Sequence, residues 1–102
     1  MRRGELWLAE VGHKRRPVLL LTRSEVLDAR SLVTVAEITT TVRGLAAETD
    51  IDHVEVGLDR PSVINCDGLH TIAQASLSGP IGRVGEGAMR KVCAAVGYAL
   101  GC

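Results

Sequence analysis

The sequence predicts a small protein of the mainly β (α+β) class, in which a strongly bent antiparallel sheet or barrel carries one C-terminal amphipathic helix. Two observations predict this class. Short apolar or β-branched segments alternate with turn residues along most of the chain, a pattern typical of antiparallel sheets. The C-terminal segment instead places apolar residues at helical spacing. A chain of 102 residues can bury a core of its own, so we expect a single domain over residues 1–102.

The two N-terminal strands are predicted by contrasting patterns. Residues 4–12 (GELWLAEVG) alternate between apolar and other side chains, with the period of a half-buried strand. Residues 17–22 (PVLLLT) form a continuous apolar run, as in a strand covered on both faces, and Pro17 stands at its start, where a strand tolerates proline. We interpret residues 13–16 (HKRR) as the loop between these strands.

A short helical turn and a third strand follow. Ser24 is placed to cap a turn over residues 25–29, whose first residues include an acid that the helix dipole favours. Residues 31–40 (SLVTVAEITT) are rich in β-branched side chains and predict the third strand.

The middle of the chain predicts shorter strands. The Arg-Gly pair at 43–44 indicates a turn. Residues 53–56 (HVEV) predict a fourth strand, and residues 63–67 and 70–73 predict two more.

The C-terminal helix is predicted by five apolar residues on one helical face, with Gly101 placed to end the helix. These residues are Met89, Val92, Cys93, Val96 and Leu100.

Composition argues against several classes of protein. No apolar run approaches the roughly 18 residues that cross a bilayer, and acids interrupt the N-terminus where a signal peptide would be apolar, so we expect a cytoplasmic protein. The three cysteines are odd in number and lack CxxC spacing, which argues against a disulfide framework and a zinc site. We interpret them as reduced thiols, with Cys66 and Cys93 buried, and expect neither a metal nor a cofactor.

Charge is balanced overall but unevenly distributed. Twelve basic and twelve acidic residues cancel, and most of the basic ones lie before residue 44. A neutral protein can still bind a polyanion if its positive groups converge on one face. The two aromatic residues, Trp7 and Tyr98, are both interpreted as structural.

Three segments could carry chemistry, namely residues 15–17 (RRP), 38–41 (ITTT) and 65–71 (NCDGLHT). All three stand at predicted strand ends, where neighbouring loops can converge. An arginine fork suits bidentate contact with a phosphate. The alternatives stay open at this point: solvated loop arginines, threonines that only favour β structure, and a structural histidine at position 70.

Five segments carry a resemblance that covers nearly the whole chain: RRGELWLAE, RRPVLLLT, VAEITTTVRGL, PSVINCDGLHTI and IGRVGEGAMRKVCAAVGYALG. In this order they resemble the MazF/PemK-type endoribonuclease toxins of type II toxin–antitoxin systems. The resemblance implies an SH3-like barrel of the CcdB/PemK type with a C-terminal helix. It further implies a homodimer that cleaves single-stranded RNA without a metal or the ribosome, and a MazE-type antitoxin as partner.

The resemblance also implies an active pair, which falls on Arg16 and Thr39. Metal-free cleavage can use the 2′-hydroxyl of the RNA as nucleophile, leaving a cyclic phosphate and a free 5′-hydroxyl. Arg16 would neutralise charge on the phosphorane, and Thr39 would hold the phosphate in line. Because a guanidinium is a poor acid or base at neutral pH, His13 and His70 are hypotheses for proton transfer.

Further residues expected to contact RNA lie in the same segments and in the loop that follows. They are Lys14, Arg15, Thr40, Arg43, Asn65, Asp67 and His70. We expect residues 13–16 to make the RNA groove locally cationic. Residues 66–70 (CDGLH) depart from the family pattern, so the resemblance does not imply a cleavage sequence.

Two other functions are compatible with this fold. A CcdB-type DNA gyrase poison shares the barrel but not the nuclease chemistry. A noncatalytic interaction module could bind a partner peptide along a strand edge. The RRP and ITT segments favour the nuclease, because a gyrase-binding protein has no need of an arginine opposite a hydroxyl at a phosphate.

Overall fold

A computed structural model describes residues 1–102. Its elements, in chain order, are β1 (Glu5–Val11), β2 (Lys14–Leu20), the 3-10 helix η1 (Ser24–Ala29), β3 (Leu32–Thr39), β4 (Glu48–Asp50), β5 (Val63–Ala73), the 3-10 helix η2 (Gln74–Ser76), β6 (Ser78–Arg83) and α1 (Glu86–Leu100).

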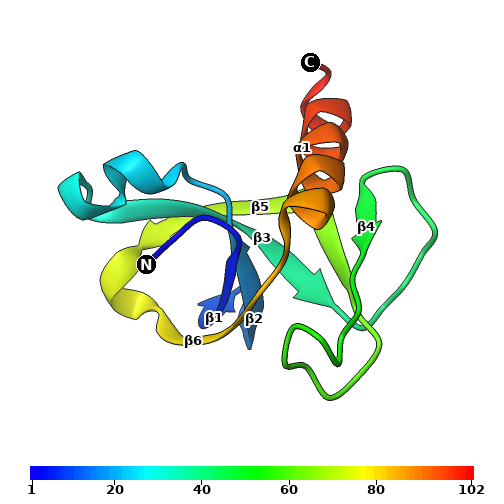
Figure 1. The fold of residues 1–102 in the computed structure, drawn as a ribbon, viewed down its shortest axis with the longest axis horizontal. Coiled ribbons are helices and arrows are strands. Elements are labelled where there is room, and N and C mark those ends of the chain that lie inside the picture. Colours follow the sequence, from blue (N-terminus) through cyan, green and yellow to red (C-terminus); the bar gives the residue numbers. More distant parts are fainter.

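The six strands form one antiparallel sheet in the order β4-β5-β3-β2-β1-β6. Helix α1 follows at the C-terminus and lies against β5 and β4 (Figure 1). The predicted architecture is confirmed, with one refinement: the sheet is strongly bent but open, since β4 and β6 are its two edges.

Both faces of the sheet are buried against apolar side chains. One core cluster lies between the sheet and α1 and includes Leu19, Ile64 and Val92. A second cluster, which includes Val18 and Val33, fills the other face. Alternation along β2 therefore sends neighbouring side chains to different clusters, which explains the continuous apolar run of residues 17–22.

The connection between β1 and β2 is shorter than the sequence analysis predicted. Only Gly12 and His13 form the turn, and both have positive φ angles, of 59° and 65°, as a two-residue type I′ hairpin requires. Pairing resumes at Val11 and Lys14. The interpretation of residues 13–16 as a loop was wrong, because the tight turn lets Lys14, Arg15 and Arg16 pair as part of β2.

The predicted strand at residues 53–56 was also wrong. This segment is a turn, because Oδ1 of Asp52 accepts hydrogen bonds from the backbone N–H groups of Val54 and Glu55, a local competitor of strand pairing. The fourth strand is instead β4, three residues that pair with the start of β5.

β5 is one strand where two short strands were predicted. Its register against β3 shifts between the pairs Ala36–Leu69 and Glu37–Asn65, so residues 66–68 form a bulge. β6 was not predicted at all, because its sequence, SGPIGR, lacks a strand pattern. Gly82 in β6 has no side chain and lies against the carbonyl of Val56.

The two helical predictions are confirmed in position but corrected in detail. η1 begins at Ser24, yet this side chain does not cap it, since Ser24 Oγ accepts a hydrogen bond from the backbone N–H of Arg3. α1 ends at Gly101, which adopts φ 76° and donates its N–H to the Tyr98 carbonyl.

The buried face of α1 agrees with the predicted one at Met89, Val92 and Val96, which pack in or against the core cluster, and differs from it at other positions. Val92 and Ala95 are its buried residues, whereas Cys93 and Leu100 are exposed. Tyr98 is 65% exposed and does not support the core, so its interpretation as structural was wrong. No helix in the structure combines the length and hydropathy that crossing a bilayer requires.

Candidate active site

A polar pocket of about 310 Å³ lies where β2 begins and β3 ends. Lys14 and Arg16 reach it from β2, and Glu37 and Thr39 reach it from β3. Because side chains two residues apart share a face of a strand, these four continue the face that carries Val18 and Val35 in the second core cluster. The pocket is thus the polar end of an otherwise apolar surface.

β5 and the loop after β3 complete the walls. Asn65 and Asp67 come from the start of β5, and Thr41 and Arg43 come from the loop. This loop is held in place by Glu48, whose Oε1 accepts hydrogen bonds from three consecutive backbone N–H groups, those of residues 43–45.

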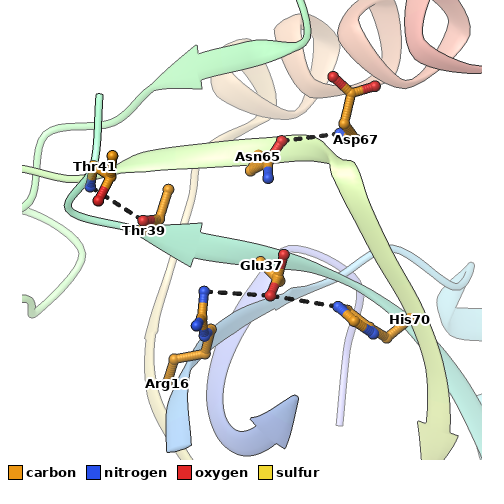
Figure 2. A network of polar contacts seen from close by, with 7 residues as sticks. All are labelled: Arg16, Glu37, Thr39, Thr41, Asn65, Asp67 and His70. Carbon is orange, nitrogen blue, oxygen red and sulfur yellow. Dashed lines mark hydrogen bonds and ion pairs between the residues drawn. The ribbon is translucent and has the colours of Figure 1, made fainter. Parts of the chain in front are cut away.

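Glu37 is the centre of a polar network (Figure 2). Its Oε1 lies 3.2 Å from Nη1 of Arg16 and 3.5 Å from Nε2 of His70. The three side chains are 15%, 22% and 31% exposed, in the order Glu37, Arg16, His70. Two buried nitrogens of these side chains, Arg16 Nε and His70 Nε2, have no hydrogen-bond partner.

The bulge in β5 makes this network possible. Asn65 and His70 are five residues apart and would face opposite sides of a regular strand. The register shift places Asn65 opposite Glu37 and His70 opposite Val35, two residues of β3 that share a face. Both β5 side chains therefore lie on the side of Glu37, as Figure 2 shows.

Hydrogen bonds to a backbone N–H two residues further along the chain fix two other polar side chains. Oγ1 of Thr39 accepts the backbone N–H of Thr41 at 3.1 Å, and Oδ1 of Asn65 accepts the backbone N–H of Asp67 at the same distance (Figure 2). Both interactions use an acceptor atom, so the Thr39 hydroxyl and the Asn65 amide keep their donor groups for a ligand.

The structure brings together six of the residues that the sequence analysis singled out. These are Lys14, Arg16, Thr39, Arg43, Asn65 and Asp67. The other four lie outside the pocket wall. Three of them are exposed: His13 at the hairpin turn, Arg15 opposite Glu10 of β1, and Thr40 directly after β3. His70 adjoins the pocket only through its contact with Glu37.

The sequence analysis missed Glu37 and Glu48, and it included Thr41 only as part of the segment 38–41. The available signal for Glu37 was a single charge inside the apolar strand segment LVTVAEIT, since a charge on a half-buried strand is rare without a partner. The two glutamates change the net charge of the pocket wall. Its three cations now face three carboxylates. The cations are Lys14, Arg16 and Arg43, and the carboxylates are those of Glu37, Glu48 and Asp67. The expected local excess of positive charge is therefore absent from the pocket wall.

The structure contains no group of three or more His, Cys, Asp or Glu side chains placed to hold a metal ion. Cys66 is the first residue of the bulge and is fully buried, and burial raises the pKa of its thiol above the ordinary value of 9.0. The charges of Asp67 and Cys93 raise this pKa further, and a hydrogen bond with Thr49 lowers it.

Comparison with known proteins identifies the family. Residues 2–100 match the family described as PemK-like, MazF-like toxin of type II toxin-antitoxin system. The chain belongs to this toxin family. Within it, the chain is 36% identical, over the full length of both proteins, to the probable endoribonuclease MazF2 of Mycobacterium tuberculosis. It is also 54% identical over 69 residues to the endoribonuclease MazF3 of that organism, covering 68% of this chain and 66% of the relative.

Solved structures agree with this assignment to the MazF-like family. The Mycobacterium tuberculosis toxin MazF-mt6 matches with a TM-score of 0.89 and 41% identity, over 95% of this chain and 96% of that one. A mycobacterial endoribonuclease in complex with its cognate antitoxin matches with a TM-score of 0.85 but only 22% identity, over 99% and 95% of the two chains, which shows the fold alone. The names of the sequence relatives confirm the predicted enzyme class, an endoribonuclease.

Proposed function

We propose that this MazF-family endoribonuclease toxin, as one domain over residues 1–102, cleaves single-stranded RNA at specific sequences in the pocket between β2, β3 and β5, without a metal ion. The observation that carries the proposal is the convergence of Arg16 and Thr39. They belong to neighbouring strands and line the same pocket, where a phosphate could accept hydrogen bonds from both.

The proposed reaction uses the 2′-hydroxyl of the RNA as nucleophile. Its oxygen attacks the adjacent phosphorus, the bond to the 5′-oxygen breaks, and the products are a cyclic phosphate and a free 5′-hydroxyl. Arg16 stabilises the negative charge that develops on the phosphorane oxygens, commonly the largest contribution to such catalysis. The Thr39 hydroxyl donates a hydrogen bond to the same phosphate and holds it in line with the attacking 2′-oxygen.

RNA recognition is assigned to the remaining polar residues around the pocket. Lys14 and Arg43 are placed to contact phosphates next to the scissile one, and Asn65 and Asp67 can hydrogen-bond to base edges. Thr40, exposed directly after β3, and Arg15, exposed on the face of β2 opposite to Arg16, are assigned more distant contacts with RNA. The matched numbers of cations and carboxylates favour recognition by hydrogen bonds over attraction by net charge.

Proton transfer by histidine remains part of the proposal in two forms. His70 acts next to Glu37, and His13 acts from the exposed hairpin turn. Unchanged cleavage rates in His13→Ala and His70→Ala would remove these roles.

The proposed partners follow from membership of a toxin–antitoxin family. We expect a homodimer in the cytoplasm and a MazE-type antitoxin that covers the RNA groove with an extended segment. Exposed apolar side chains at the end of α1, including Leu100, offer surface for subunit contact. The gyrase and interaction-module alternatives do not account for an arginine and a threonine that share a polar pocket.

The test is incubation of the purified protein with a long single-stranded RNA in excess EDTA, beside Arg16→Ala. We expect cuts at a short recurring sequence, with 5′-hydroxyl ends, and a loss of rate of roughly a hundredfold or more in the variant. Arg15→Ala is the matched control, with a smaller loss expected because its side chain lies outside the pocket. A folded wild-type protein that leaves the RNA intact would contradict the proposal and make gyrase inhibition the next assay.

A further inference from the structure

We propose that Glu37 is the proton acceptor of RNA cleavage, whose carboxylate takes the proton of the attacking 2′-hydroxyl. The inference rests on the proposed function and adds a catalytic residue to it. A guanidinium stays protonated at neutral pH and is a poor base, so the reaction needs another group beside Arg16 at the phosphate.

Glu37 lies where a proton acceptor is needed. Its Oε1 is 3.2 Å from Nη1 of Arg16, and its side chain lines the pocket together with Thr39, two residues along the same strand. A phosphate bound by Arg16 and Thr39 would therefore have the Glu37 carboxylate beside it. This position satisfies the geometric requirement for a general base, which must come within hydrogen-bond reach of the proton it removes.

The bulge in β5 provides the space for this carboxylate. A Cβ atom on Gly68 would collide with Oε2 of Glu37 and would lie 3.0 Å from Nδ2 of Asn65. Only the absence of a side chain at residue 68 allows the carboxylate to occupy its observed position. The pocket is thus shaped around an acid that is mostly shielded from solvent, at 15% exposure.

Glu37 makes fewer contacts with Arg16 than a carboxylate in a purely structural ion pair does. A structural arginine–carboxylate pair commonly forms two parallel hydrogen bonds, whereas Oε1 of Glu37 alone contacts Arg16, through one nitrogen. Arg16 Nε and His70 Nε2 have no hydrogen-bond partner although both are buried. Glu37 therefore has a single close contact with Arg16, at one oxygen, and its carboxylate can still accept a proton.

The two other carboxylates of the pocket are less suited to this role. Glu48 accepts hydrogen bonds from three backbone N–H groups of the loop that follows β3. Asp67 is exposed on the bulge and forms no ion pair with Arg16. Glu37 is the carboxylate of the pocket in contact with the arginine assigned to the scissile phosphate.

In the proposed step, one bond to phosphorus forms and another breaks while Glu37 carries a proton. The 2′-oxygen forms a bond to phosphorus while its proton passes to the Glu37 carboxylate. The bond from phosphorus to the 5′-oxygen breaks, and the leaving oxygen takes a proton from the solvent, directly or through one of the two histidines proposed above. Glu37 then releases its proton to the solvent and returns to its starting state.

The test compares wild type with Glu37→Gln, which keeps the shape and an oxygen for Arg16 but cannot accept the proton. Single-turnover cleavage rates would be measured from acidic to mildly alkaline pH, together with binding of an RNA that carries a 2′-O-methyl group at the cleaved nucleotide. The charged groups that face Glu37 are Lys14, Arg16, Arg43, Glu48, Asp67 and His70. Because Nε2 of His70 lies 3.5 Å from Oε1 of Glu37, His70→Gln is measured in parallel.

We expect Glu37→Gln to cleave at least about a hundredfold more slowly while binding the methylated RNA as wild type does. The fall in rate on the acidic side should disappear in Glu37→Gln, persist in His70→Gln, and remain at a reduced rate in Glu37→Asp. Glu55→Gln, in the exposed turn of residues 53–57 and outside the pocket wall, is the matched control and should behave as wild type.

Three results would overturn the inference: near wild-type cleavage by Glu37→Gln, an unchanged acidic fall in that variant, or a loss of RNA binding that accounts for its whole loss of rate. In each case, cleavage by wild type and its loss in Arg16→Ala would leave the proposed function standing. Absence of cleavage by wild type would overturn both.

Discussion

Thr39 shows how one backbone contact can prepare a side chain for a ligand. Its Oγ1 accepts the N–H of Thr41, a bond that forms because the chain turns directly after β3. A hydroxyl that accepts one hydrogen bond in this way has its own proton free to donate. The turn therefore orients the donor that we assign to the scissile phosphate.

This assignment predicts a sharp difference between two small substitutions. Thr39→Ser keeps the hydroxyl and should cleave RNA within a few-fold of wild type, whereas Thr39→Val keeps the shape and should lose roughly a hundredfold in rate. Single-turnover cleavage with enzyme in excess measures the chemical step directly. Equal rates in the two variants would show that the hydroxyl does not act on the phosphate.

At the scale of elements, the β1–β2 hairpin decides which basic residues reach the pocket. The two-residue turn at Gly12 and His13 starts the pairing at Lys14, and alternation then directs Lys14 and Arg16 to one face and Arg15 to the other. A loop of four residues, as expected from the sequence, would not have fixed this register.

The turn makes position 13 sensitive to the conformation of its residue. His13 has φ 65°, which Asn tolerates and a β-branched residue does not. His13→Asn should leave the free energy of unfolding within about 0.5 kcal/mol of wild type, and His13→Val should lower it by about 1 to 3 kcal/mol. Urea unfolding of both variants measures the difference, and equal midpoints would contradict the importance of the turn.

At the scale of the whole molecule, Cys66 links the active-site bulge to the packing of α1. It belongs to the core cluster between sheet and helix, and its Sγ lies 3.9 Å from the Val92 carbonyl. The residue next to it in the chain, Asp67, lines the pocket. Consecutive residues of the bulge thus face the core and the pocket, Cys66 the former and Asp67 the latter.

The raised pKa of Cys66 predicts how stability changes in alkali. Below the ordinary pKa of 9.0 the thiol is protonated in both the folded and the unfolded state, so it causes no change of stability with pH. Above 9.0 the unfolded chain ionises first, because burial raises the pKa in the folded state, so the free energy of unfolding should fall as the pH rises further.

Urea unfolding between pH 7 and 10 tests this prediction. Cys93→Ser/Cys102→Ser removes the two exposed thiols and should keep the alkaline fall. Adding Cys66→Ala should reduce the fall, although the cavity lowers stability at every pH. An unchanged alkaline slope after removal of Cys66 would assign the effect to another group.

The sequence by itself determined the mainly β class, the two-faced burial of PVLLLT and the position of α1, because these depend on local periodicity. Its order of segments also indicated Arg16 and Thr39. Only the tertiary structure decided the short strand β4, the edge strand β6, the exposure of Cys93 and the place of Glu37. These depend on which distant segments pair: the contact between Glu37 and His70 needs a bulge in β5 and a glycine at residue 68. No pattern within β3 carries that information, since the space for a charged side chain is made by its neighbour in the sheet.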